Sequence, residues 1–244
     1  MEFSLLLTII FTVMAYGAGA IFIVGLLSKL FKYAKTPSPL KIPTNPAPLT
    51  PVGAAFRVMK DVRWFDSLFK GNKWTWIGGI VFHYAFLLVV LRHLRYFLYP
   101  VGWDMALQNY GIYAGYVLPI AVLYLLMRRT TVDRTMFVSS LADYFALALI
   151  FGIAVTGLFM KFYARPFMVD VKGFVYGLVS LNFSTVPTEP VFLLHFTLVM
   201  TLLAYFPFSK LIHAGGIFFS PTRHQCDNPR EKRHINPWAS NLSA

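Results

Sequence analysis

One apolar segment, residues 190–215, limits what this chain can fold into. It is long enough to cross a lipid bilayer as a helix, for which about 20 apolar residues suffice. Histidines stand near both of its ends, His195 and His213. On a straight α-helix their separation of 18 residues is five turns, so both would project from one face, about 27 Å apart along the axis. Because ionisable residues are rare inside membrane spans, this pair indicates a function.

The composition agrees with a membrane protein, since 57% of the 244 residues are hydrophobic and only 13% are charged, about half the charged share of soluble domains. The sequence predicts an all-α integral membrane protein, a five-transmembrane-helix bundle. Its spans are residues 3–30, 74–98, 109–127, 141–162 and 190–215. The first is too long for a signal peptide and has no basic region before it, so we expect it to be retained. Residues 1–219 then form one membrane domain, and residues 220–244 form a basic tail.

The distribution of positive charge predicts the orientation of the chain. The net charge is +12, and with five spans 17 of the 22 Lys and Arg residues fall on one side of the membrane. The positive-inside rule makes that side cytoplasmic. The N-terminus is then outside, the C-terminus is cytoplasmic, and the expected location is the cytoplasmic (inner) membrane. No nucleic-acid-binding motif accompanies the charge, so the expected partner is membrane lipid and not nucleic acid.

Residues 29–73, between the first two spans, contain two different stretches. Six prolines from Pro37 to Pro51 predict an extended linker, because proline interrupts helices. From Val52 to Phe69, apolar residues recur at three- and four-residue steps with basic residues between them. This pattern predicts an amphipathic helix that either lies in the membrane surface or docks on the soluble face of a partner.

The second span carries two further histidines, His83 and His93. Spans two and five run in opposite directions, so His93 and His195 share the outer level, whereas His83 and His213 share the inner level. The two histidines of span two are about 15 Å apart along the axis and about 80° apart around it, against about 27 Å on span five. Tilt, or a bend at Pro207, is needed to bring the partners together.

Two imidazoles at each level favour haem over zinc. Zinc sites use three or four clustered protein ligands, whereas a porphyrin supplies its own four nitrogens and needs only two axial histidines. The chain has no CxxCH attachment motif, so two non-covalent haem b groups are predicted. The alternative is that the four histidines only pack helices and bond to neighbouring carbonyls. Glycines near the ligands would give the macrocycles room: Gly78, Gly79, Gly215 and Gly216.

Five spans, with His-x9-His in the second (His83, His93) and His-x17-His in the fifth (His195, His213), resemble the di-haem cytochrome b family of the respiratory nitrate reductase gamma subunit. The resemblance covers residues 74–215. It implies that His93 and His195 hold an outer haem beside a quinol site. It also implies that His83 and His213 hold an inner haem, which passes electrons to a cytoplasmic iron–sulfur subunit.

Other details look more like the branch of this family found in sulfate reducers, which includes the DsrM-type subunit of the DsrMKJOP complex and its Hme and Tmc relatives. These details are His-Leu-Arg at residues 93–95, the proline-rich linker and the tail FFSPTRHQCDNPREKRHINPW. The likeness implies a DsrK-like iron–sulfur partner, related to heterodisulfide reductase, within a multi-subunit complex.

The predicted function is electron transfer between menaquinone, or another quinone, and that cytoplasmic partner in a respiratory complex linked to sulfate reduction. The subunit is not expected to turn over alone. A gamma subunit of a respiratory nitrate reductase is one alternative. A haem-free membrane anchor or a transporter is an alternative of another class, although no internal repeat favours a transporter.

Quinol oxidation releases protons, so titratable or cationic side chains are expected near the outer ends of the spans. The candidates for quinone contact, each equally an interfacial anchor or a partner of a haem propionate, are Arg92, Arg95, Tyr113, Lys161 and Tyr163. Asp143, near the inner end of span four, is a candidate for proton chemistry or simply a helix N-terminal carboxylate. Cys226 has no assignable role, and His224 and His234 in the tail are expected to be solvated.

Overall fold

The computed structural model describes residues 2–36, 43, 45–100, 102, 104–228 and 230, and all regular secondary structure among them is helical. Five helices are long and apolar enough to cross a membrane, which confirms the predicted five-helix, multi-pass membrane protein. They are α1 (Glu2–Lys35), α4 (Lys73–His93), α5 (Asp104–Thr131), α7 (Leu141–Phe162) and α9 (Pro190–Tyr205). The shorter elements are α2 (Pro51–Trp64), α3 (Asp66–Gly71), η1 (Leu94–Tyr96), α6 (Asp133–Phe137), α8 (Met168–Ser180), η2 (Phe206–Phe208), η3 (Lys210–Ile212), α10 (His213–Gly216), η4 (Ile217–Phe219) and α11 (Pro221–His224).

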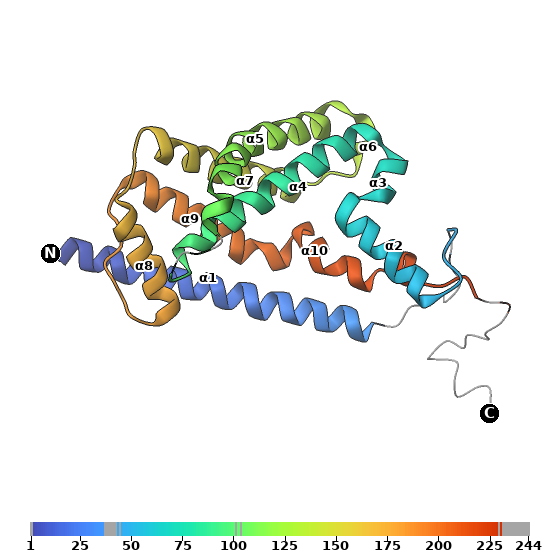
Figure 1. Cartoon of the computed structure of the whole chain (residues 1–244), viewed down its shortest axis with the longest axis horizontal. Helices are drawn as coiled ribbons and strands as arrows, with labels where there is room; N and C mark the ends of the chain where they lie inside the picture. Colours follow the sequence, from blue (N-terminus) through green and yellow to red (C-terminus); the bar gives the residue numbers. More distant parts are fainter. Residues whose placement is uncertain are drawn as a thin grey trace.

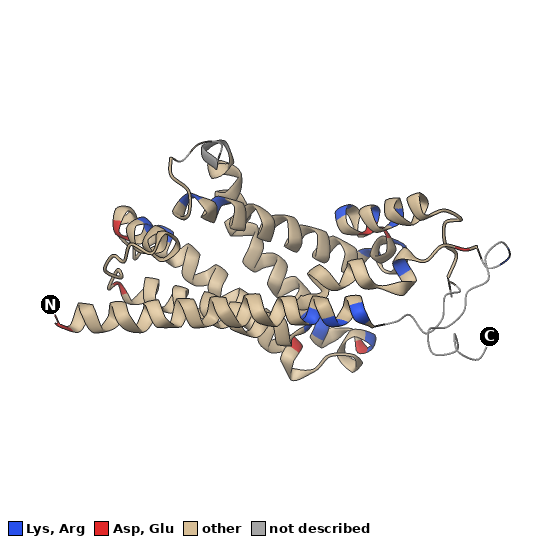
Figure 2. Ribbon diagram, turned by 90° about the horizontal axis from the view of Figure 1, so that it is seen from below, with Lys and Arg blue, Asp and Glu red and all other residues tan. Residues whose placement is uncertain are grey.

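The long helices run roughly along one axis, and neighbours pack in the order α4, α5, α7, α9, α1 (Figure 1). α4 and α9, which carry three of the four predicted ligands, are not among the closely packed pairs. The bundle has two ends. One, the α8 end, holds α8 and the N-terminus of α1, and the other, the α2 end, holds α2, α3 and α11. Figure 2 shows Lys and Arg gathered at these two ends.

The start of α7 is fixed by a capping box, the arrangement in which the first turn and the preceding residue satisfy each other. The Asp143 carboxylate accepts hydrogen bonds from the N–H and the hydroxyl of Ser140, at 2.9 and 3.1 Å. It also lies 2.7 Å from the Lys210 ammonium and 3.4 Å from the Arg129 guanidinium. Asp143 therefore ties α7 to the segment after α9, which favours the helix N-terminal role over proton chemistry.

The fifth span is not one straight helix. α9 ends at Tyr205, and the chain passes through η2 and η3 before α10 begins at His213. The break contains Pro207, which lacks a backbone donor and cannot continue the helix. The five regular turns of a straight helix between His195 and His213 therefore do not form, and the bend expected at Pro207 is confirmed. The bend seats against α1, where a Cβ placed on Gly25 would lie 2.7 Å from the Pro207 Cβ.

This contact makes Gly25→Ala a test of the packing of α1 on the bend. The added methyl group must push α1 away from Pro207, so we expect a loss of stability of about 1–3 kcal/mol, typical of overpacked sites. The matched control is Gly19→Ala on the same helix, because a Cβ there meets nothing within 4 Å. Thermal unfolding of both variants in detergent measures the difference. Equal unfolding temperatures for the two variants would contradict this account of the bend.

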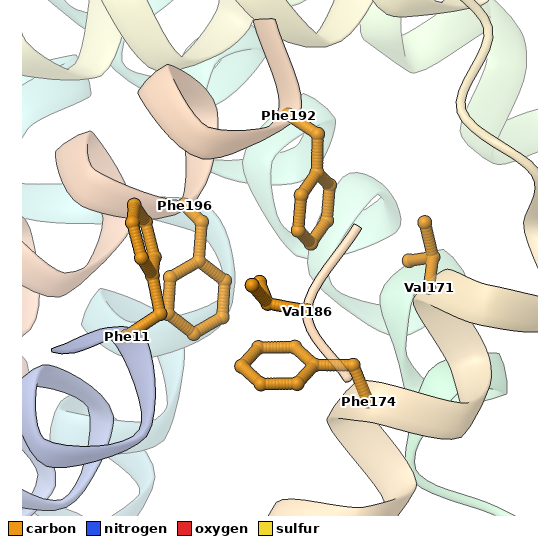
Figure 3. Close-up of a cluster of buried hydrophobic side chains, with 6 residues drawn as sticks. All are labelled: Phe11, Val171, Phe174, Val186, Phe192 and Phe196. Atoms are coloured by element: carbon orange, nitrogen blue, oxygen red, sulfur yellow. The ribbon is translucent and has the colours of Figure 1, made fainter. Parts of the chain in front are cut away.

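Residues 163–189, between the fourth and fifth predicted spans, contain the helix α8, which was not predicted from the sequence. The signal lies in Val171, Phe174 and Leu178, which recur at helical spacing and face the bundle. Figure 3 shows side chains from α1, α8, α9 and the irregular segment before α9 gathered into one buried cluster. Its members are Phe11, Val171, Phe174, Val186, Phe192 and Phe196. The cluster holds α8 against the bundle and positions the start of α9, which carries His195.

The amphipathic segment is two helices instead of one, because Phe65 adopts a left-handed conformation (φ 51°, ψ 44°) between α2 and α3. The buried Asp61 carboxylate holds this elbow. It accepts from the Ser67 N–H at 2.8 Å and from the Arg223 guanidinium of α11 at 3.0 Å. The start of the tail is thus packed against α2. The apolar residues of α2 remain exposed, as a helix in the membrane surface and a helix that docks on a partner both require: Val52, Phe56, Met59 and Val62.

Candidate functional site

α4 carries His83 and His93, and each ring is held by the helix itself. Nδ1 of His83 lies 2.7 Å from the carbonyl of Gly79, and Nδ1 of His93 lies 2.6 Å from the carbonyl of Val89. A carbonyl oxygen can only accept, so Nδ1 is the donor in both rings. The proton then sits on Nδ1, and Nε2 keeps the lone pair that can bind a metal ion.

The two histidines of the fifth span are also held through Nδ1, although His195 is held by a neighbouring helix. His213 Nδ1 lies 2.9 Å from the carbonyl of Lys210. His195 Nδ1 lies 2.9 Å from the Thr156 hydroxyl of α7. That hydroxyl also lies 2.7 Å from the carbonyl of Gly152, to which it donates its single proton. It is therefore an acceptor toward His195. All four rings are fixed through Nδ1, the arrangement usual for metal-ligating histidines.

The structure brings the four histidines together in two pairs. The ring centres of His83 and His213 are 5.9 Å apart, with planes at 90°. Those of His93 and His195 are 6.4 Å apart, with planes at 14°. Metal–imidazole nitrogen bonds are about 2 Å long, so two rings that bind one ion from opposite sides have centres roughly 6 Å apart. Both pairs fit a bis-histidine iron centre.

Two residues beside His195, Thr156 and Gly157, were not identified from the sequence. Thr156 orients the His195 ring, as described above. Gly157, the next residue, leaves the ring its space, since a Cβ there would lie 3.3 Å from Cε1 of His195. Neither belongs to a sequence motif, because their role depends on α7 packing against α9. A small residue beside a threonine within a span was the only available signal.

Of the four glycines predicted to make room for macrocycles, Gly78 and Gly215 instead allow close packing of neighbouring helices. A Cβ on Gly78 would lie 2.6 Å from the Tyr124 ring of α5, and one on Gly215 would lie 2.6 Å from Leu30 of α1. Gly79 and Gly216 are less crowded, with nearest side-chain atoms at 3.4 and 3.6 Å.

Aromatic side chains contact both pairs. The ring of Phe65, at the elbow between α2 and α3, lies 4.9 Å from that of His83, and the ring of Phe82 lies 5.0 Å from it. Tyr96 lies 5.8 Å from His93. Such rings exclude water from the space around the imidazoles and keep its dielectric constant low, which tunes any redox centre there.

The five predicted quinone contacts fall into two groups. Arg92 and Arg95 converge on Gln108 of α5, at 3.2 and 3.0 Å, and Lys161 at the end of α7 lies close enough to Arg92 for their charges to interact. Gln108 was not identified from the sequence. Tyr113 and Tyr163, by contrast, are 68% and 79% exposed on the surface of the bundle.

The tail residues can be placed only in part. His224 is exposed, Cys226 is a half-exposed free thiol, and His234 lies outside the described residues. Within the described ranges no three His, Cys, Asp or Glu side chains gather as a metal site.

Comparison with known proteins identifies the family of the chain. Residues 52–230 match the nitrate reductase gamma subunit family, and that range contains all four. The chain is 34% identical to the Hdr-like menaquinol oxidoreductase cytochrome b-like subunit of Archaeoglobus fulgidus, over 93% of this chain and 82% of that protein. It is 30% identical to the subunit of the same name from Archaeoglobus profundus, over 95% and 83%. The chain therefore belongs to the nitrate reductase gamma subunit family, in which it is similar to the Hdr-like cytochrome b subunits.

Proposed function

We propose that the chain is a membrane di-haem cytochrome b that carries electrons between the quinone pool and a cytoplasmic iron–sulfur subunit. His83 and His213 would hold one haem b toward the α2 end, and His93 and His195 a second toward the α8 end. The observation that carries the proposal is the geometry of these pairs, with ring centres 5.9 and 6.4 Å apart and every Nδ1 already engaged. Each haem, when bound, supplies a one-electron redox centre.

Helix packing alone accounts for this geometry less well. A hydrogen bond from Nδ1 to a carbonyl also occurs in purely structural histidines, so it does not discriminate. Packing does not, however, require a second imidazole opposite the first. Here an imidazole of α4 lies opposite an imidazole of the fifth span at two levels, although α4 and α9 are not a closely packed pair. Two such coincidences favour ligation.

Quinone chemistry belongs at the α8 end in this proposal. Arg92, Arg95 and Lys161 supply donors and positive charge beside the His93 level. Tyr113 and Tyr163 stand exposed on the same part of the bundle, where a lipid-soluble quinone would arrive. Menaquinone is the substrate favoured by the names of the relatives.

The partner belongs at the α2 end. With five spans, 17 of the 22 Lys and Arg residues fall on this side, so the positive-inside rule favours it as the cytoplasmic side of the cytoplasmic membrane. The exposed apolar face of α2, with α11 packed beside it, offers a surface for an iron–sulfur subunit. The Hdr-like relatives favour a DsrK-like subunit in a complex linked to sulfate reduction over a nitrate reductase. Mass spectrometry of the natively purified complex would identify the subunit that binds there.

Absorption and EPR spectra of the purified protein test the proposal. We expect two b-type haems per chain by pyridine haemochrome assay, both low-spin because both have two histidine ligands. The two should be distinguishable by EPR, since perpendicular imidazole planes at 90° give a more anisotropic signal than nearly parallel planes at 14°. Protein that folds in the membrane without haem would overturn the proposal in favour of an anchor or a transporter.

A further inference from the structure

Two arginines and one glutamine form a polar cluster beside the His93 level. Nε of Arg92 and Nη1 of Arg95 both donate to Oε1 of Gln108, at 3.2 and 3.0 Å. The Arg92 stem lies directly on α5, because a Cβ on Gly111 would be 2.7 Å from its Cβ and Cδ. The cluster is thus held by α4, η1 and α5 together, and the position of the Gln108 side chain is fixed from one side.

These bonds decide which way the Gln108 amide faces. Guanidinium groups only donate, so the atom toward the arginines is the oxygen, and Nε2 faces away from them. Nε2 is buried and has no hydrogen-bond partner among the described residues. A buried donor without an acceptor is destabilising and rare in native proteins. A hydrogen-bond acceptor bound at this position would supply the missing partner.

The charge of the cluster narrows the chemistry of that acceptor. Arg92, Arg95 and the nearby Lys161 are all cationic, and none of the ion pairs within the described part of the chain includes them. A quinone carbonyl would accept a hydrogen bond but leave the positive charge unbalanced. A carboxylate would do both, since it accepts from guanidinium and amide donors in a charge-assisted arrangement.

We propose that Nε2 of Gln108, together with Arg92 and Arg95, binds a carboxylate of the haem held by His93 and His195. Arg92 directly precedes His93 in the chain, so the cluster adjoins that ligand. Gln108 is then a positioning residue that fixes the orientation of the haem and, through the charge that the cluster presents, raises its midpoint potential. The inference rests on the proposed function, since it requires a haem at this level.

The test compares Gln108→Glu and Gln108→Leu. The glutamate keeps the acceptor for both arginines and replaces only the amide donor, so it retains the packing if the leucine variant folds poorly. The control is Asn109→Leu, which removes an exposed amide from the next position of the same helix. Each variant is measured by redox titration followed by EPR, by the rate of haem transfer to apomyoglobin, and by the KM for a menaquinol analogue.

Both Gln108 variants should lower the midpoint potential of the haem with nearly parallel ligands and speed its release about 10-fold, the effect of losing one hydrogen bond to a charged group. The other haem and the Asn109→Leu protein should match the wild type. Unchanged potential and release in both variants would overturn the inference. So would a raised KM with unchanged haem properties, which would assign the amide to the quinone. A wild-type protein without haem would instead overturn the proposed function itself.

Discussion

Replacing His93 with alanine is expected to lower the haem content from two groups to one per chain and to end reduction of the protein by quinol. Alanine offers no lone pair, and the imidazole that the structure places opposite His195 is that of His93, at 6.4 Å between ring centres. Quinol-dependent turnover of the complex should fall below roughly one hundredth, since loss of even an outer-shell partner costs about 10–100-fold. Pyridine haemochrome assay and EPR measure the loss.

The EPR signal identifies which haem is lost. The signal from nearly parallel imidazoles should disappear, and the more anisotropic signal from the perpendicular pair His83–His213 should remain. His224→Ala is the matched control, because it removes an exposed histidine from the tail. Retention of both haems in the His93→Ala protein would refute the pairing.

Replacing His213 with alanine is expected to remove the other haem. Reduction of the protein by quinol should then be uncoupled from electron delivery to the partner. Quinol should still reduce the haem held by His93 and His195, because the Arg92–Arg95–Gln108 cluster at the α8 end is unchanged. Electrons should then stop, because the centre toward the α2 end is missing. Stopped-flow reduction of the purified complex by a menaquinol analogue would show one haem reduced at a near wild-type rate and no reduction of the partner's iron–sulfur clusters.

A second variant at this position, His213→Met, tests the same assignment while keeping an axial ligand. Methionine can replace histidine as an axial ligand and raises the potential of the iron it binds. This protein should keep two haems, with a raised midpoint potential for the one near the α2 end only. A His213→Met protein with one haem, or with a shifted potential at the His93 level, would contradict the assignment of His213 to the inner pair.

The membrane spans could be predicted from sequence because they are a local property. A bilayer requires about 20 apolar residues of helix, and composition within each segment decides whether it qualifies. The depth of each histidine also follows from its position in a span and from the direction of the chain. The helix α8 was missed because its apolar spacing was outweighed by the mixed character of residues 163–189, and its stability comes from Phe11 and Phe196 on other helices.

Other features depend on contacts that no local pattern encodes. The elbow at Phe65 exists because Asp61 binds Ser67 and an arginine 162 residues away in the tail. Gln108 lies within a span otherwise notable for its apolar and aromatic residues, and it gains a role only because α5 packs against the end of α4. Thr156 likewise matters only through the position of His195.

The sequence by itself determined that this chain crosses a membrane five times and carries two histidines on each of two antiparallel spans. Helix rise and bilayer thickness alone decide which segments can span and at what depth each histidine lies. Only the tertiary structure decided how histidines 18 residues apart on one span meet histidines 10 residues apart on the other. The break at Pro207, which packs against Gly25 of the first helix, brings them together. Such a bend depends on which surfaces the helices bury against each other, and that is settled by packing between residues far apart in the chain.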